Sequence, residues 1–279
     1  MINDFQVAGG SIIGTEHVRT GKNNHDDFFW DKNGKILIGL ACDGCGSGKH
    51  SEVGSKIGSR LIANSFLRLC KLEASVPWER IRQDVIAQIQ ILASAMGGSL
   101  TQTINDYFLF TVVGALITSQ TSYLFSIGDG LIAVNGEIVR VGPFANNTPP
   151  YLAYELVSSS IDRDLLKFHV HKNIETKKVQ SILIGTDGVF DLENSEERKI
   201  PGKEDLVGPI SQFWQDKRYY NNPDMIRRSL SLINRCVTRI PKGEDGSLKI
   251  QHENGLLPDD TTIVAIRRIP LNHDTEKGD

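Results

Sequence analysis

Aspartate residues stand at the ends of apolar, strand-like runs at four widely separated places in this chain. In chain order they are Asp26-Asp27 after N-N-H, Asp43-Gly44 after I-L-I-G-L-A-C, Asp187-Gly188 after I-L-I-G-T, and Asp259-Asp260 before T-T-I-V. Strands that pack in one core bring their ends to a common edge, so we expect these carboxylates to meet there. An oxygen-rich site of this kind suits hard divalent cations such as Mg²⁺ or Mn²⁺. The pattern therefore predicts a metal-dependent hydrolase.

The composition is that of an ordinary globular protein. The chain has 279 residues, of which 39% are hydrophobic and 23% charged, enough for one large domain with a substantial core. A net charge of −3 argues against a nucleic-acid partner. Because no apolar run reaches membrane-spanning length and no signal peptide is evident, we expect a cytoplasmic protein without a membrane partner.

The four cysteines do not form the pattern of a disulfide framework. Cys42 and Cys45 make one C-x-x-C, whereas Cys70 and Cys236 stand alone, so zinc spacing is absent. A redox pair at Cys42 and Cys45 is the less favoured interpretation.

Strands and helices are expected in groups rather than in alternation, which favours an α+β fold. Apolar stripes at helical spacing predict helices over residues 51–69, 78–95 and about 223–237. Strands are predicted over residues 5–16, 27–30, 35–42, 107–117, 122–127, 131–134, 137–141, 166–171, 181–186 and 261–267. Loops are expected over residues 17–26, 143–160 and 241–258, with a polar excursion from the core over 193–222. We expect one domain over residues 1–270 and a polar tail over 271–279.

The segment D-G-C-G-S-G-K-H-S at residues 43–51 resembles a phosphate-binding P-loop between a strand and a helix. The match fails at two positions, because the first glycine of the motif falls on Asp43 and the Mg²⁺-binding hydroxyl on His50. An aspartate facing the phosphates would repel them, so a nucleotide-binding enzyme is disfavoured.

Taken together, the acidic motifs resemble the PPM-type metal-dependent protein phosphatases, the protein phosphatase 2C family, and in particular a bacterial subgroup. The motifs are N-x-D at 24–26, D-G-x-G at 43–46, S-x-G-D at 126–129, D-G at 187–188 and D-D-x-T at 259–262. The resemblance covers about residues 8–267 and implies a two-sheet antiparallel β-sandwich flanked by α-helices, in αββα order.

The resemblance also implies an activity. It is that of a serine/threonine protein phosphatase, which hydrolyses phosphomonoesters by attack of a metal-bridging hydroxide. Its substrate would be a phosphorylated protein, and its partner a Ser/Thr kinase whose action it reverses. Two Mn²⁺ or Mg²⁺ ions are implied, with a third more loosely held. By motif match the catalytic residues are Asp43, Asp187 and Asp259, and the metal-binding residues are Asp26, Asp43, the Gly44 carbonyl, Asp129, Asp187 and Asp259.

The chain departs from the family pattern where the substrate phosphate is gripped. Gly21 stands where the family often has an arginine, and His17, Arg19 or Lys22 are candidates to replace it. Leu131 stands where a second arginine is common. These changes motivate an alternative, a weak or inactive phosphatase-like domain that binds phosphoproteins or regulates them.

Two further departures lie beside the predicted metal ligands. Cys45 replaces a histidine proposed as a general acid in some members, a role that metal-bound water can also fill. Asp260 replaces a common asparagine, and its extra negative charge is expected to tighten metal binding.

Overall fold

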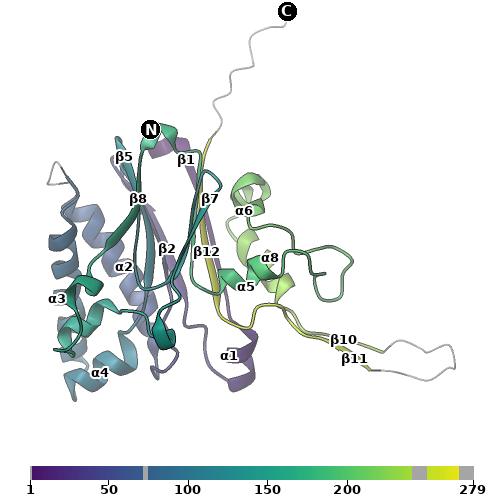
Figure 1. The fold of residues 1–279 in the computed structure, drawn as a ribbon, viewed down its shortest axis with the longest axis horizontal. Helices are drawn as coiled ribbons and strands as arrows, with labels where there is room; N and C mark the ends of the chain where they lie inside the picture. The colour runs from purple at the N-terminus through teal and green to yellow at the C-terminus, as the bar shows by residue number, and fades with distance from the viewer. Residues whose placement is uncertain (1, 72–74, 241–249, 270–279) are drawn as a thin grey trace, which may run out of the picture.

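Two five-stranded antiparallel sheets form the centre of the computed structural model, which describes residues 2–71, 75–240 and 250–269 (Figure 1). The first sheet has the order β1 (Phe5–Ile12), β12 (Thr261–Arg268), β9 (Ser181–Gly185), β6 (Gly130–Val134) and β7 (Glu137–Val141). The second has the order β2 (Asp27–Lys32), β3 (Leu37–Cys42), β4 (Val112–Ile117), β5 (Thr121–Ile127) and β8 (His169–Glu175). A separate ribbon pairs β10 (Val237–Arg239) with β11 (Gln251–Glu253).

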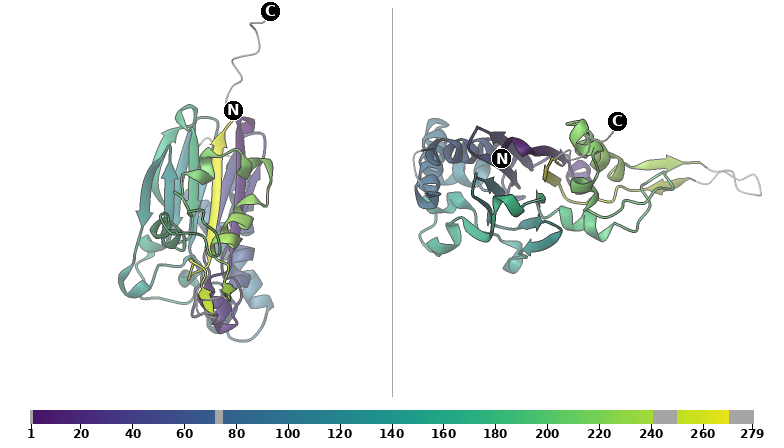
Figure 2. Two further views of the ribbon diagram at one scale, coloured as in Figure 1. Left: turned by 90° about the vertical axis from the view of Figure 1, so that its right-hand side faces the viewer. Right: turned by 90° about the horizontal axis from the view of Figure 1, so that it is seen from above.

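Helices cover the outer face of each sheet (Figures 1 and 2). The described helices are α1 (Thr15–Thr20), α2 (Ser51–Leu69), α3 (Trp78–Ala95), α4 (Leu100–Tyr107), α5 (Val189–Asn194), α6 (Gln212–Gln215), α7 (Arg218–Asn221) and α8 (Met225–Ile233). Of these, α1 lies at one end of the sandwich and not over a sheet face (Figure 1). Short 3₁₀ turns occur at Ile2–Asp4, Ala145–Asn147, Leu152–Leu156, Arg163–Leu166 and Thr176–Lys178. The predicted αββα sandwich is confirmed.

The inner faces of the two sheets bury a continuous apolar core. Ile184 of β9 and Val264 of β12 are direct partners in the ladder, and both are fully buried in this layer. Gly39 of β3 faces them from the other sheet, and a Cβ atom there would lie 3.4 Å from the Val264 and Ile266 side chains. The two sheets therefore approach as closely as their side chains allow, and each buried aliphatic side chain contributes about 1.5–3 kcal/mol.

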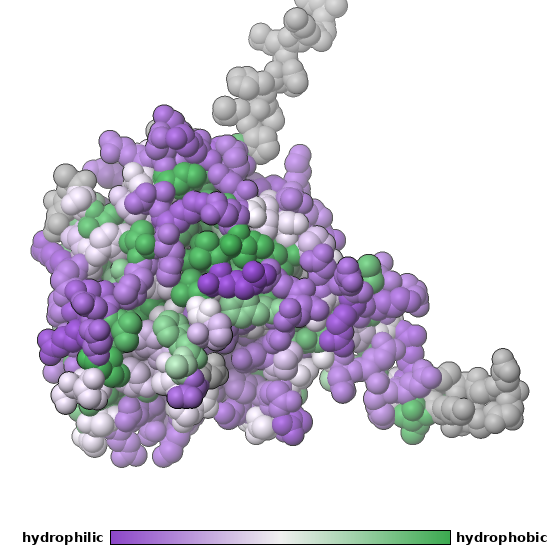
Figure 3. Space-filling model, viewed as in Figure 1, coloured by the Kyte–Doolittle hydropathy of each residue, from purple (hydrophilic) through white to green (hydrophobic). Residues whose placement is uncertain are grey.

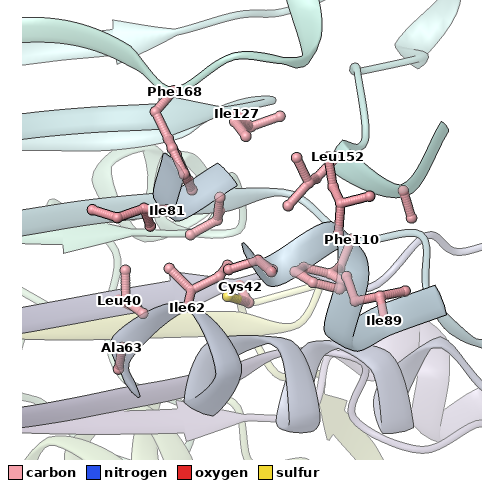
Figure 4. Close-up of a cluster of buried hydrophobic side chains, with 14 of the residues drawn as sticks. Leu40, Cys42, Ile62, Ala63, Ile81, Ile89, Phe110, Ile127, Leu152 and Phe168 are labelled. Atoms are coloured by element: carbon pink, nitrogen blue, oxygen red, sulfur yellow. The ribbon is translucent and has the colours of Figure 1, made fainter. Parts of the chain in front are cut away.

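The outer face of β3 packs against α2, and α3 belongs to the same apolar cluster. Leu40 and Cys42 alternate with residues that face the sandwich, and they contact Ile62 and Ala63 of α2 in one apolar cluster (Figure 4). Because helices cover one face of β3 and the opposite sheet covers the other, every residue of β3 is buried. This double covering explains why the sequence of β3 is continuously apolar rather than alternating.

The other outer layer contains a correction to the sequence prediction. Residues 193–222 are not an excursion from the core, because they contain α6 and α7, which lie over the first sheet. Phe213 and Tyr219 are fully buried there, with ring centroids 4.8 Å apart, and they pack with Leu230 of α8. Polar residues separate these aromatic side chains in the sequence, so the segment shows no periodic apolar pattern that would predict a buried helix.

The N-terminal prediction is also wrong in part. The strand predicted over residues 5–16 ends at Ile12, and the expected loop over 17–26 begins with α1. The helix starts where the N–H groups of Thr15 and Glu16 donate to the carbonyls of Leu257 and Pro258, each at 3.0 Å. It ends at Gly21, which has φ +71°. Distant backbone, rather than local sequence, therefore satisfies the first amides of α1.

Other boundaries differ by smaller amounts. The predicted strand 107–117 begins only at Val112, because α4 extends to Tyr107 after an N-cap at Ser99. The strand predicted over 166–171 is β8, displaced toward the C-terminus, and the late helix ends at Ile233 before β10. Part of the loop predicted over 241–258 and the tail predicted over 271–279 lie outside the described residues.

The surface in Figure 3 is largely hydrophilic, with hydrophobic groups gathered in a band near the middle of this face. No helix within residues 2–71, 75–240 and 250–269 combines the length and the apolar character that a bilayer crossing demands.

Candidate functional site

Four aspartates at strand ends line one cleft of about 300 Å³. Asp43 follows β3, Asp129 lies between β5 and β6, Asp187 follows β9, and Asp259 precedes β12. Since β9 and β12 are antiparallel neighbours, the end of one strand lies beside the start of the other. The structure thus brings together the predicted ligands of the first and second ions and the predicted ligand of the third. The remaining lining residues are His17, Gly44, Cys45, Gly46, Ser47, Pro149 and Tyr151.

The turn after β3 is fixed by backbone contacts. The Asp43 carbonyl accepts a hydrogen bond from the Thr111 N–H at 2.8 Å, and the Gly44 N–H donates to the His25 carbonyl at 3.2 Å. A Cβ atom on Gly44 would lie only 2.8 Å from the Ser51 carbonyl oxygen. Glycine is therefore required at position 44, where the backbone borders the cleft.

The carboxyl groups of the site destabilise one another's charge. Burial, with added repulsion from Asp26 and Asp187, raises the pKa of Asp43 well above its usual value. Burial, together with the charges of Asp259 and Asp129, raises the pKa of Asp187 to about 7. Burial likewise raises the pKa of Asp129. In the absence of cations, the protein holds these groups against an unfavourable electrostatic energy.

Asp26 lies behind the cleft rather than on its wall. Its carboxyl group comes within hydrogen-bonding reach of that of Asp43. One oxygen, Oδ2, accepts a hydrogen bond from the Thr186 hydroxyl at 2.7 Å, whereas the buried Oδ1 has no hydrogen-bond partner. Burial and the nearby Asp260 raise the pKa of Asp26 well above its usual value. An unpartnered buried carboxylate oxygen at this position indicates that something outside the chain completes it.

The donor set fits hard divalent cations. It offers carboxylate oxygens, a backbone carbonyl at Gly44 and an orphaned oxygen at Asp26, which are the ligand types that Mg²⁺ and Mn²⁺ prefer. Within the described part of the chain, no three His, Cys, Asp or Glu side chains converge into a finished all-protein site. Such a site is not needed, because Mg²⁺ usually keeps several waters and uses one or two carboxylates.

Asp260, next to the cleft, has both of its oxygens engaged by the protein. Oδ1 accepts from the Gly14 N–H at 2.7 Å, and Oδ2 accepts from the His25 N–H at 2.5 Å. The Oδ2 atom also lies 2.8 Å from Nδ1 of His17. The structure therefore gives Asp260 a role that the sequence did not suggest, since it fastens residues 14–25 to the start of β12.

The three candidates for gripping phosphate occupy different environments. Of these, only His17 lines the acidic cleft. Arg19 pairs with Glu16, with Nε 3.1 Å from Oε2, and lines a different groove beside Val18. The ammonium group of Lys22 donates to the Gly46 carbonyl at 2.8 Å, at the edge of the cleft.

Cys45 borders the same cleft without a disulfide partner. Its Sγ lies 3.1 Å from the Ser47 hydroxyl. Burial acts to raise the pKa of the Cys45 thiol, but hydrogen bonds with Ser47 and Tyr151 outweigh it and lower the pKa. Cys42 is fully buried in the apolar layer, where burial raises the pKa of its thiol.

Sequence reasoning did not single out Thr186 and Tyr151, which complete the surroundings of the acidic residues. A signal for Thr186 was available, since a hydroxyl interrupts the apolar run immediately before Asp187. Tyr151 gave none, because it follows two prolines in a segment without periodicity.

Comparison with known proteins agrees with this architecture. A structure of a bacterial serine phosphatase superimposes with a TM-score of 0.53 at 13% identity, over 94% of this chain and 97% of the other. The serine/threonine phosphatase Stp1 from Staphylococcus aureus superimposes with a TM-score of 0.50 at 14% identity, over 94% of each chain. At these identities the likeness shows the fold alone. No curated protein gives a significant match.

A family model provides support from the sequence itself. The model described as protein phosphatase 2C matches residues 13–226, which is well over half of the chain and includes Asp26, Asp43, Asp129 and Asp187. The match stops before Asp259, which the fold brings back to the same cleft. The chain therefore belongs to the protein phosphatase 2C family of phosphatases.

Proposed function

We propose that this chain is a serine/threonine protein phosphatase that requires two Mn²⁺ or Mg²⁺ ions. The observation that carries the proposal is the meeting of Asp43, Asp129, Asp187 and Asp259 in one cleft, with carboxyl pKa values raised by burial and mutual repulsion. Divalent cations relieve that repulsion, and membership of the phosphatase family supports a phosphomonoester as the substrate.

Each acidic residue has a proposed task. Asp43 and the Gly44 carbonyl would hold the two ions from one sheet, Asp187 and Asp259 would hold one of them from the other sheet, and Asp129 would help to hold a third. Two ions bound there would supply Lewis acidity to the phosphoryl group and a water of lowered pKa. Asp26 would accept a hydrogen bond from such a water through its unpartnered Oδ1, while the Thr186 hydroxyl donates to Oδ2.

The cleft also suits the substrate class. It is open to solvent on the side of Gly46 and Ser47, both exposed, so a phosphorylated side chain on a protein surface can enter it. A phosphorylated protein is therefore the proposed partner, and a Ser/Thr kinase that modifies the same protein would be its functional opposite.

Hydrolysis of p-nitrophenyl phosphate tests the proposal directly. We expect turnover with about 2 mM Mn²⁺, none with EDTA, and a loss of more than about 100-fold in Asp43→Asn. Asp31→Asn, which changes an exposed aspartate of β2, serves as the matched control and should keep wild-type turnover. Phosphoserine and phosphothreonine peptides should be hydrolysed faster than a phosphotyrosine peptide of the same sequence.

The outcome also discriminates the alternative. If the protein binds Mn²⁺ in calorimetry but hydrolyses neither the aryl phosphate nor the peptides, the phosphatase-like binding module replaces the enzyme as the better description. If Asp43→Asn retains wild-type turnover, the assignment of the cleft as the active site is wrong.

A further inference from the structure

The acidic cleft contains one side chain able to carry positive charge. Among the described residues that line it, four are aspartates and His17 alone is basic. A phosphate monoester that enters this cleft brings about two negative charges and needs a donor beyond the proposed cations. Gly21, where the family pattern leads us to expect an arginine, has no side chain and ends α1 on open surface, where a Cβ atom would have nothing within 4 Å of it.

The two other nearby cations do not line the cleft. Arg19 is held by Glu16 and is 72% exposed, in a groove that does not include the metal ligands. The ammonium group of Lys22 donates to the Gly46 carbonyl at the edge of the cleft, but Lys22 is not among the residues that line it. His17 is the remaining candidate, and its side chain is 16% exposed.

The orientation of the His17 ring is fixed from behind. Asp260 is buried, and its Oδ2 lies 2.8 Å from Nδ1 of His17. A carboxylate in this position only accepts hydrogen bonds, so Nδ1 carries the proton of this contact. The ring centroid also lies 4.4 Å from that of His25. These contacts leave Nε2 as the nitrogen available to a ligand in the cleft.

The carboxylate that holds His17 is itself immobile. Its side chain is only 1% exposed, and the N–H groups of Gly14 and His25 donate to it at 2.7 Å and 2.5 Å. An asparagine at position 260 would present one acceptor oxygen instead of two, and it could not serve all three donors equally. Aspartate, unlike asparagine, can therefore accept from the His17 ring while both of its oxygens also accept from backbone N–H groups.

We propose that His17 as its imidazolium, with Nδ1–H donating to Asp260, binds a terminal oxygen of the substrate phosphate through Nε2–H, and that Asp260 is the positioning residue that aims it. The pair takes over the task of the arginine that this chain lacks at Gly21. This inference rests on the proposed phosphatase function and adds to it a phosphate-binding donor that belongs to the protein rather than to the cations.

Steady-state kinetics and phosphate binding test the pair. We expect His17→Ala to raise KM for phosphopeptide and the inhibition constant for inorganic phosphate by about 10- to 100-fold, the worth of one charge-assisted hydrogen bond. Its kcat and its Mn²⁺ affinity should change far less. His17→Arg should recover most of the lost affinity, and His169→Ala, an exposed histidine of β8, is the matched control.

Asp260→Asn should act in the same direction as His17→Ala. If Asp260 works through His17, the double variant should have the KM of His17→Ala alone, because the two effects are not additive. A KM that rises by the product of the single effects would overturn the positioning role. Should Asp260→Asn unfold, His17→Gln and His17→Ala still test the phosphate contact.

Two results would overturn the contact itself. One is an unchanged KM and phosphate inhibition constant in His17→Ala, and the other is a tenfold or greater loss of Mn²⁺ affinity, which would make His17 a metal ligand. Calorimetric titration of Mg²⁺-loaded protein with inorganic phosphate separates this inference from the function. It reports the effect of His17→Ala even if the wild-type protein shows no turnover.

Discussion

At the scale of single residues, the buried carboxyl groups that are proposed to bind cations lower the stability of the metal-free protein. Asp26, Asp43 and Asp187 would each be easier to accommodate as neutral groups, because burial and neighbouring charges raise their pKa values. The same repulsion favours divalent cations, which replace protons as the neutralising charge. Residues that bind the ions should therefore destabilise the metal-free protein.

Asp187→Asn tests whether a buried carboxyl group of the cleft destabilises the metal-free protein. The pKa of Asp187 is about 7 in the folded state and about 3.8 when unfolded, so the folded state holds its proton more tightly. The stability that comes from this tighter proton binding is fully present below pH 4. It falls as the pH rises from about 4 to 7, and it is lost above pH 7. In EDTA at pH 8, the variant should therefore be more stable than the wild type, by an amount on the order of a few kcal/mol.

The measurement is urea unfolding of both proteins in EDTA at several pH values. The stability difference between variant and wild type should shrink as the pH is lowered toward 4, while Mn²⁺ binding by the variant is lost at every pH. A variant less stable than the wild type at pH 8 would show that Asp187 makes favourable contacts that outweigh the repulsion.

Cys45 allows a second test at this scale. The thiol borders the cleft but no proposed step uses it, so Cys45→Ser should keep most of the wild-type kcat. Steady-state kinetics with p-nitrophenyl phosphate measure this, and Ser47→Ala, which removes the hydroxyl beside the thiol, is a companion variant. A loss of about 1,000-fold or more, roughly 4 kcal/mol of transition-state stabilisation, would mean that Cys45 takes part in the chemistry.

At the scale of elements, α2 positions the turn that carries Asp43. The helix packs so closely on the end of α4 that a Cβ on Gly54 would lie 1.8 Å from the Tyr107 carbonyl oxygen. Gly58 is equally close to Phe110, because a Cβ on Gly58 would lie 2.1 Å from Cζ of the Phe110 ring. Phe110 in turn bridges to Gly44, next to the cleft. The two glycines of α2 therefore set the distance between the helix and the metal-binding turn.

Gly54→Ala should expose this constraint. An alanine in a helix normally stabilises it by up to about 1 kcal/mol relative to glycine, but here the clash should dominate and cost about 1–3 kcal/mol. Urea unfolding measures the effect. Gly34→Ala is the matched control, since nothing lies within 4 Å of a Cβ at that position. If Gly54→Ala were as stable as the wild type, α2 would be free to shift.

The elements also show what the sequence can and cannot predict. Strands β3, β9 and β12 were predictable because continuous apolar runs mark strands covered on both faces. Helix α1 was not, because its first amides bond to carbonyls at residues 257–258. The acidic residues of the cleft followed from their positions at strand ends, whereas the pairing of His17 with Asp260 depends on a contact between opposite ends of the chain.

At the scale of the whole molecule, metal binding should be linked to stability. The proposed ligands come from β3 in one sheet and from β9 and β12 in the other, so ions bound in the cleft hold the two halves of the sandwich together. Any ion that binds only the folded state stabilises it by about 2.7 kcal/mol at 100 times its Kd.

Thermal unfolding at pH 7.5 measures this linkage. Millimolar Mn²⁺ should raise the Tm of the wild type by several degrees, EDTA should reverse the rise, and Asp259→Asn should abolish it. Asp31→Asn should respond as the wild type does. A Tm that is insensitive to Mn²⁺ in the wild type would argue that the cleft does not hold ions tightly enough to bridge the sheets.

The hydrogen bonds of Asp260 have a consequence for how the enzyme comes into being. They join residues that are 246, 243 and 235 positions apart in the sequence, and strand β12, which they anchor, lies between β1 and β9. A ribosome makes Gly14 and His17 long before it makes Asp259 and Asp260. The growing chain thus has neither its complete acidic cleft nor an aimed His17 until the last strand has emerged. The proposed activity therefore requires a chain whose synthesis has passed β12, and a partly made chain would lack it.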